Sequence, residues 1–296
     1  DMDFAMGLLA EIEASKDPGV KYRDSRPIMD MKHLIDTSCA QFAENPAFFI
    51  KDKKGGTYRE IKYKQLLEDR NGFGTALTEA GFQGKRISII GENNYRWAVS
   101  YLATVGGVGV VVPLDKALSA TELEKFIKVA DVSCVICDEK YVGTFSEMCK
   151  RGDTPLTCVI NMQGTESKDG VMAWDEMLEA GKNLVKKGKR EFLDAQVIAE
   201  EMCALLFTSG TTGTSKGVML SHRNLVADLM CAPTVLWVKP EDKFFSFLPV
   251  HHSYECTCGF LMPLYKGASI AYCEGLKYIV KNLSEAQPTF FLGVPA

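Results

Sequence analysis

Ten consecutive residues combine glycines, hydroxyl side chains and a lysine in a pattern that suits the binding of an anion. The stretch TSGTTGTSKG, residues 208–217, contains three glycines, six hydroxyl side chains and one lysine. Glycines let backbone N–H groups converge on an anion, hydroxyls add donors, and the lysine adds a mobile positive charge. The stretch therefore predicts a polyphosphate-binding loop made of Thr208, Ser209, Gly210, Thr211, Thr212, Gly213, Thr214, Ser215, Lys216 and Gly217.

Two other interpretations of this stretch are less favourable. A flexible linker is not expected between the apolar residues 203–207 and the apolar residues 218–220. The Walker P-loop has the pattern G-x-x-x-x-G-K-[ST]. With its first glycine aligned on Gly210, it requires glycine at the position of Ser215 and a hydroxyl side chain at the position of Gly217. A kinase or GTPase of the Walker type is therefore disfavoured.

The elements around the loop alternate between strands and helices. Short apolar runs predict strands at residues 86–90, 108–112, 132–137 and 157–160, with helical patterns between them. Such alternation implies right-handed crossovers, and hence an α/β fold with doubly wound, mostly parallel sheets. We expect a first lobe over residues 1–190, with an N-terminal helix and a hairpin, and a second, incomplete lobe over residues 191–296. Residues 161–189, polar and weakly periodic, are the expected connection.

Bulk composition excludes several classes of protein. The chain has 296 residues, 46% hydrophobic and 24% charged, with a formal net charge of -4, so disorder and a nucleic-acid footprint are not expected. The longest nearly apolar run, residues 98–114, is shorter than a membrane span and contains glycines. We expect no transmembrane segment, a cytoplasmic location, and ten cysteines that are reduced. The pair Cys134 and Cys137 lies within an expected strand and is not a redox motif.

Three segments resemble one family. FTSGTTGTSKGVMLSH, residues 207–222, looks like the signature loop of the acyl-adenylate-forming superfamily. GENNYRWAVSYLATVGGVGVVVPLD, residues 91–115, and LPVHHSYECT, residues 248–257, are similar to long-chain fatty acid–CoA ligases. The resemblance covers most of the chain from about Phe48 onward.

The resemblance implies a ligase that activates a carboxylic acid, here a medium- or long-chain fatty acid, with ATP and Mg²⁺ and then transfers the acyl group to coenzyme A. The loop would hold the β- and γ-phosphates, with the Thr208 hydroxyl approaching Mg²⁺ and Lys216 supporting the polyphosphate charge. His252 matches a histidine beside the acyl-carboxylate pocket. Gly293, in FFLGVPA, would border the adenine and acyl pockets.

Several motifs of that family are not found in this sequence. They are the acidic residue that completes the magnesium site, the ribose-binding aspartate, the hinge, and the small C-terminal domain with its catalytic lysine. We therefore expect the chain to be a portion of a longer enzyme and to be inactive by itself. An adenylation domain serving a carrier protein and a non-catalytic nucleotide-binding module stay open, as do a homodimer and a peripheral membrane contact. A zinc site at His251, His252, Cys256 and Cys258 lacks the usual paired spacing.

Overall fold

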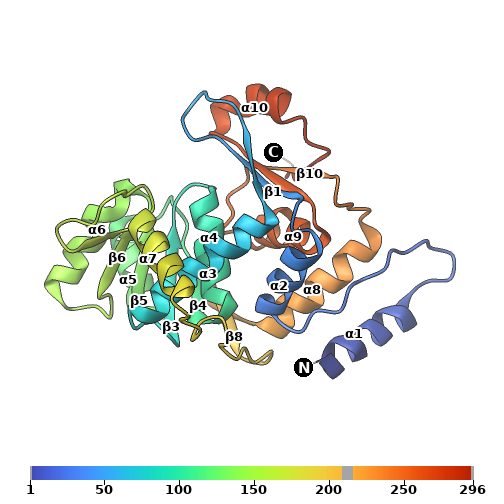
Figure 1. The fold of residues 1–296 in the computed structure, drawn as a ribbon, viewed down its shortest axis with the longest axis horizontal. Helices are drawn as coiled ribbons and strands as arrows, with labels where there is room; N and C mark the ends of the chain where they lie inside the picture. The colour runs from blue at the N-terminus through green and yellow to red at the C-terminus, as the bar shows by residue number, and fades with distance from the viewer. Residues whose placement is uncertain (1, 209–215, 295–296) are drawn as a thin grey trace. The chain divides into compact units, whose positions relative to one another are not determined.

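The computed structural model describes residues 2–208 and 216–294 (Figure 1). The chain forms two compact units, each described here by itself. Unit 1 comprises Asp1–Leu67, Ile198–Glu201 and Ser221–Ala296. Unit 2 comprises Glu68–Val197 and Met202–Leu220.

Unit 2 is built on a seven-stranded sheet in the order β7-β6-β5-β3-β4-β8-β9. The pairs from β7 through to β8 are parallel. Its central strands are apolar on both faces, as a parallel sheet covered on two sides requires. The strands are β3 (Lys85–Ile90), β4 (Gly109–Pro113), β5 (Val132–Cys137), β6 (Cys158–Asn161), β7 (Val171–Ala173), β8 (Met202–Thr208) and β9 (Lys216–Ser221).

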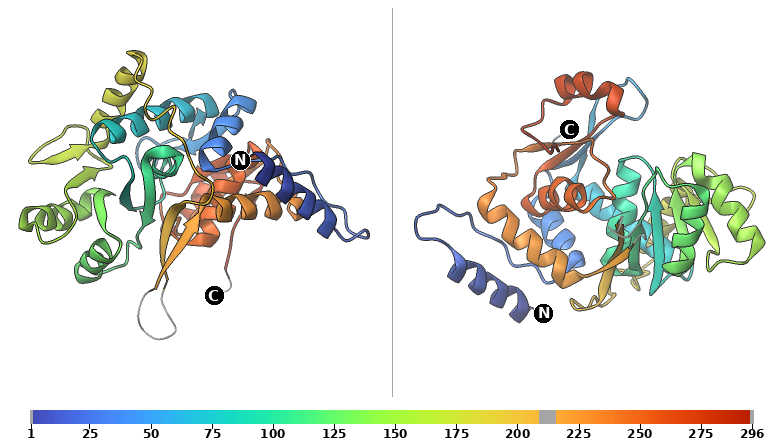
Figure 2. Two further views of the ribbon diagram at one scale, coloured as in Figure 1. Left: turned by 90° about the horizontal axis from the view of Figure 1, so that it is seen from below. Right: turned by 180° about the vertical axis from the view of Figure 1, so that it is seen from behind.

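Helices cover this sheet on both faces (Figure 2). Phe126 of α5 and Phe145 of α6 belong to one buried cluster together with Val135, Val159 and other strand residues, so these two helices share a face. A capping box starts α5, with Ser119 and Glu122 bonded reciprocally. The helical elements are α3 (Tyr63–Glu79), α4 (Tyr95–Ala103), η1 (Thr104–Val108), α5 (Ala120–Val129), α6 (Glu139–Arg151) and α7 (Trp174–Lys186).

Helix α7 overturns the expectation that residues 161–189 are only a connection between lobes. Its Trp174 ring stacks on Phe73 of α3, with centroids 4.9 Å apart, and its indole N–H donates to Ser100 Oγ at 2.9 Å. A Cβ on Gly181 would lie 1.8 Å from the carbonyl oxygen of Gly72, so α7 approaches α3 more closely than any other residue would allow. The helix therefore belongs to the packed body of unit 2.

Unit 1 contains a second sheet, in the order β12-β10-β11-β1-β2. The predicted hairpin is confirmed as an antiparallel pair of β1 and β2, and the other pairs are parallel. The strands are β1 (Pro46–Ile50), β2 (Arg59–Lys62), β10 (Lys243–Ser246), β11 (Ser269–Tyr272) and β12 (Phe290–Phe291). The helical elements are α1 (Met2–Ser15), α2 (Met31–Gln41), α8 (His222–Val235), η2 (Glu255–Leu261), α9 (Met262–Lys266), η3 (Leu276–Tyr278) and α10 (Ile279–Ala286).

The units are interleaved along the chain, whereas the sequence led us to expect consecutive lobes divided at residue 190. The reason is long-range pairing, because β1 lies beside β11, with Phe48 opposite Ile270. β8 and β9 in turn join the sheet of unit 2 through β4, with Val111 opposite Ala204. The expected doubly wound, mostly parallel α/β fold is nevertheless confirmed. In the described part of the chain, no helix is long and apolar enough to span a bilayer.

Candidate functional site

Strand β8 carries the start of the predicted phosphate loop out of the core of unit 2. Cys203 and Ala204 are buried, and Phe207 stacks on Phe126 with ring centroids 4.1 Å apart. Thr208, the last residue of the strand, is exposed. Because β8 runs parallel to its neighbour β4, Thr208 lies at the carboxyl edge of the sheet, where open α/β sheets bind their ligands.

Strand β9 returns from the same edge and begins at Lys216, whose side chain is exposed. β8 and β9 are neighbours in the sheet, so the end of one and the beginning of the other flank the loop (Figure 2). A Cβ on Gly217 would lie 3.2 Å from Leu205 Cδ1, which favours glycine where the strands meet. The other predicted loop residues lie outside the described part of the chain: Ser209, Gly210, Thr211, Thr212, Gly213, Thr214 and Ser215.

Beyond β9, a capping box starts α8, with Ser221 as the N-cap and Asn224 in the partner position. His222, the first residue of this helix, is buried, and its Nδ1 accepts a hydrogen bond from the Met31 backbone N–H at 3.3 Å. Burial lowers the pKa of His222 to about 4. This histidine is therefore neutral and structural at physiological pH.

In unit 1, the predicted His252 follows β10, at the carboxyl end of that strand. β10 lies between β11 and β12 and is parallel to both. The His252 side chain is exposed and its ring centroid lies 4.2 Å from that of the half-buried His251. Its backbone is fixed, since its N–H donates to Pro249 O at 3.1 Å and its carbonyl accepts from the Cys256 N–H at 2.9 Å.

A buried carboxyl group that the sequence analysis missed lies one turn beyond His252. Glu255 is 1% exposed and accepts a hydrogen bond of 2.7 Å from Ser246 Oγ at the end of β10. Burial is the main cause that raises its pKa, to about 7, while the Ser246 bond opposes the shift. A Cβ on Gly259 would lie 2.6 Å from the carboxyl carbon of Glu255, so the carboxyl folds back over this glycine.

The sequence contains only a weak signal for Glu255. Glu255 is the only acidic residue between Asp242 and Glu274, and a glycine follows it four residues later. It also opens η2, a π-helix, and such segments recur at functional sites.

Gly293 lies two residues beyond β12 and is exposed. A Cβ there would make only an ordinary contact, 3.9 Å from the Phe291 ring. The surroundings do not require glycine at this position, so a role in close ligand approach stays a prediction. Thr208, Lys216 and Gly217 belong to unit 2, whereas His252 and Gly293 belong to unit 1.

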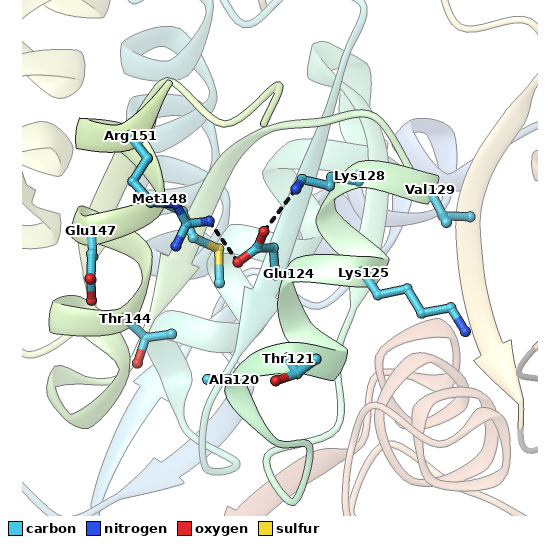
Figure 3. Close-up of a pocket in the computed structure, with 10 residues that line it drawn as sticks. All are labelled: Ala120, Thr121, Glu124, Lys125, Lys128, Val129, Thr144, Glu147, Met148 and Arg151. Atoms are coloured by element: carbon cyan, nitrogen blue, oxygen red, sulfur yellow. Dashed lines mark hydrogen bonds and ion pairs between the residues drawn. The ribbon is translucent and has the colours of Figure 1, made fainter. Parts of the chain in front are cut away.

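An open hollow of about 610 Å³ lies elsewhere in unit 2, between α5 and α6 (Figure 3). Three of its charged side chains pair with one another, because Glu124 bridges Lys128 at 2.8 Å and Arg151 at 2.6 Å. None of the predicted site residues lines it. We therefore assign it no part in the predicted chemistry.

The sequence profile described as AMP-binding enzyme matches residues 35–296 of this chain. The chain belongs to the AMP-binding enzyme family. Two curated relatives carry more specific names. Fatty acyl-CoA synthetase A of Dictyostelium discoideum is 31% identical over 265 residues, which are 83% of this chain and 37% of the relative. Long-chain-fatty-acid--CoA ligase 5 of Rattus norvegicus is 30% identical over 259 residues, 82% of this chain and 37% of the relative.

Solved structures agree with the fold of an AMP-binding enzyme. The anthranilate CoA ligase AuaEII in complex with anthranoyl-AMP has a TM-score of 0.76 at 20% identity, over 92% of this chain and 50% of that chain. A long-chain-fatty-acid-CoA ligase (FadD1) from Archaeoglobus fulgidus has a TM-score of 0.76 at 17% identity, over 93% and 53%. The chain thus spans less than half the length of these curated relatives and about half of these solved structures.

Proposed function

We propose that the protein containing this AMP-binding chain activates a medium- or long-chain fatty acid with ATP and transfers the acyl group to coenzyme A. The observation that carries the proposal is the pair of neighbouring strands β8 and β9. They bring Thr208 and Lys216 to the same edge of a parallel sheet, at the two ends of a loop rich in glycine and hydroxyl groups. The names of the two curated relatives support a fatty acid as the substrate.

In the first step, a carboxylate oxygen of the acid attacks the α-phosphorus of ATP, and the bond from that phosphorus to the bridging oxygen of pyrophosphate breaks. The electron pair leaves with pyrophosphate, so negative charge grows on the β- and γ-phosphates. Lys216 and the donors of the loop stabilise that charge. The Thr208 hydroxyl would supply one oxygen ligand to Mg²⁺, a hard cation that would add further charge neutralisation.

In the second step, the deprotonated thiol of coenzyme A attacks the acyl carbonyl carbon and AMP leaves.

We assign His252, exposed at the carboxyl end of β10, to holding the substrate carboxylate by a hydrogen bond. Its neighbour His251 and the bonded turn from Pro249 to Cys256 limit where the imidazole can lie.

Pyrophosphate exchange into ATP tests the first step with the full-length protein and acids from acetate to palmitate. Thr208→Ala and Lys216→Ala are each expected to slow exchange by about 10²-fold, because each removes one group that stabilises the leaving pyrophosphate. Thr121→Ala and Lys125→Ala, at exposed positions of α5, are matched controls that should leave exchange unchanged. If no acid supports exchange, the proposed ligase activity is wrong. If the Thr208 and Lys216 variants match the controls, the loop assignment is wrong.

The acceptor is tested separately, by supplying the acyl-adenylate with either coenzyme A or a phosphopantetheinyl carrier protein. Formation of acyl-CoA supports the proposal. Transfer to the carrier protein alone would reassign the protein as a carrier-loading adenylation enzyme.

A further inference from the structure

Three consecutive apolar side chains are exposed at the carboxyl end of α8. Val235, Leu236 and Trp237 have exposed fractions of 60%, 41% and 48%. The helix ends at Val235, and the backbone is extended at its C-cap, Leu236. The other two tryptophans, Trp97 and Trp174, are 1% and 2% exposed. Adjacent exposed apolar side chains bordered by polar residues are a feature of surfaces that meet a partner.

Two cations lie against the exposed indole. The guanidinium carbon of Arg23 is 3.4 Å from the centroid of the Trp237 ring, and Lys21 Nζ is 5.5 Å from it. Among the residues that the structure describes, no ion pair joins Lys21 or Arg23 to a carboxylate. Their charges are therefore available to an external anion while their stems cover the ring. We call Lys21, Arg23, Val235, Leu236 and Trp237 the Trp237 surface.

The segment that carries these cations is hydrogen-bonded to α8. The Arg23 backbone N–H donates to Thr234 O at 2.8 Å, and the Ser25 hydroxyl donates to Met230 O. Figure 1 shows this segment running beside α8 after it leaves α1. Since Lys21, Arg23 and all of α8 belong to unit 1, the cations and the apolar tip form one preorganised surface.

Two further cations, Arg26 and Lys266, lie near Arg23. Burial is the main cause that lowers the pKa of Lys266, and Arg26 lowers it further; Asp24 opposes the shift, and Arg23 adds to it. Arg23 and Arg26 therefore each lie close enough to Lys266 to repel it, with Asp24 as an opposing charge. Such a cluster attracts anions.

We propose that the Trp237 surface binds a lipid bilayer that contains anionic lipids. Tryptophan favours the membrane–water interface, where its apolar ring and its N–H group are both satisfied, and Leu236 and Val235 add apolar area beside it. Lys21 and Arg23 are placed to meet the lipid phosphates, and each cation near an anionic leaflet strengthens binding by roughly fivefold. A stable protein interface takes roughly 20–30 residues on each partner, far more than the three apolar residues here. The inference is independent of the proposed ligase activity.

Vesicle sedimentation of the full-length protein tests the proposal, with phosphatidylcholine vesicles and with vesicles that also contain 30% phosphatidylglycerol. We expect binding to the anionic vesicles that weakens as salt rises from 50 to 300 mM. Lys21→Gln combined with Arg23→Gln should weaken binding by about 25-fold, from two cations, and Trp237→Ser by at least tenfold. Leu276→Ser, at a position 75% exposed outside the surface, and Lys277→Gln beside it are controls that should bind as the unaltered protein does.

Fluorescence supplies a local readout, because Trp97 and Trp174 are buried. The spectrum of the unaltered protein minus that of Trp237→Ser should shift to the blue with anionic vesicles and be quenched by brominated lipid. Failure to bind anionic vesicles, or equal binding by the surface and control variants, would overturn the proposal. So would a dimer in solution that Trp237→Ser dissociates with no change in vesicle binding, since a second copy would then occupy the surface. Pyrophosphate exchange with a short soluble acid should be unaltered in all these variants, which separates this test from that of the ligase.

Discussion

Replacing Glu255 by glutamine removes a buried ionisable carboxyl group and should change how the stability of unit 1 depends on pH. The carboxyl group is 1% exposed and has Ser246 Oγ as its hydrogen-bond donor, at 2.7 Å. Glutamine has nearly the same shape and keeps an oxygen that can accept this bond, but it carries no titratable proton. The variant therefore isolates the charge of Glu255 from its packing.

The raised pKa of Glu255 determines the sign and the size of its contribution to stability. The pKa of Glu255 is about 7 in the folded protein, against 4.5 for an ordinary glutamic acid, so the folded state holds the proton more tightly. Its contribution to stability is fully present below pH 4.5 and is lost as the pH rises through 7. The full contribution is about 3 kcal/mol, of which about 2.5 kcal/mol disappears between pH 5 and pH 8.

Urea unfolding at pH 5 and pH 8 measures this contribution. The change in the free energy of unfolding between the two pH values is compared for the unaltered protein and the variant. The free energy of unfolding of the unaltered protein should fall by about 2.5 kcal/mol, from pH 5 to pH 8, relative to that of the Glu255→Gln variant. Glu11→Gln, on the exposed side of α1, is the matched control and should track the unaltered protein. If Glu255→Gln also tracks it within about 0.5 kcal/mol, the buried carboxyl does not titrate as the structure implies, and the reasoning fails.

Two further predictions concern the titration of His222 in unit 1 and the helix contact at Gly181 in unit 2. The pKa of His222, about 4 in the folded state against 6.5 ordinarily, gives the opposite dependence, with stability fully present above pH 6.5 and lost as the pH falls through 4. His222→Asn, which can still accept from the Met31 N–H, should lack this loss of about 3 kcal/mol in the same urea titration, and an unchanged acid dependence would contradict the assignment. Gly181→Ala should destabilise unit 2 by about 1–3 kcal/mol, because the new Cβ meets the Gly72 carbonyl oxygen. Gly143→Ala, with no atom within 4 Å of the new Cβ, is its control in thermal unfolding, and equal melting temperatures for the two variants would refute the close helix contact.

Local chemistry made much of the fold predictable. The strand at Val132–Cys137 is found as expected, because a short apolar run depends only on neighbours in sequence. Helix α7 was missed although Trp174, Met177, Leu178 and Gly181 form its buried stripe, because glycines and lysines around it weakened the pattern. The division into units was missed because no local signal says that β1 pairs with β11.

The same distinction applies to the candidate site. Thr208 and Lys216 could be located because the loop is defined by composition over ten adjacent residues. Glu255 could not, since its burial and its shifted pKa depend on Ser246 and on the packing around η2. The roles of His252 and Gly293 rest on the resemblance of the sequence to the family.

The interleaving of the two units has a consequence for biosynthesis. The partner of Phe48 in the sheet, Ile270, is made roughly 220 residues later, whereas the strands of unit 2 are complete once residue 221 has been made. At about 5–20 residues per second, the β1–β2 hairpin leaves the ribosome some 10–45 s before β11 can join it. During that interval the buried Phe48 and the unpaired edge of β1 have no native cover, so the nascent chain exposes an apolar strand edge on which non-native pairing can begin.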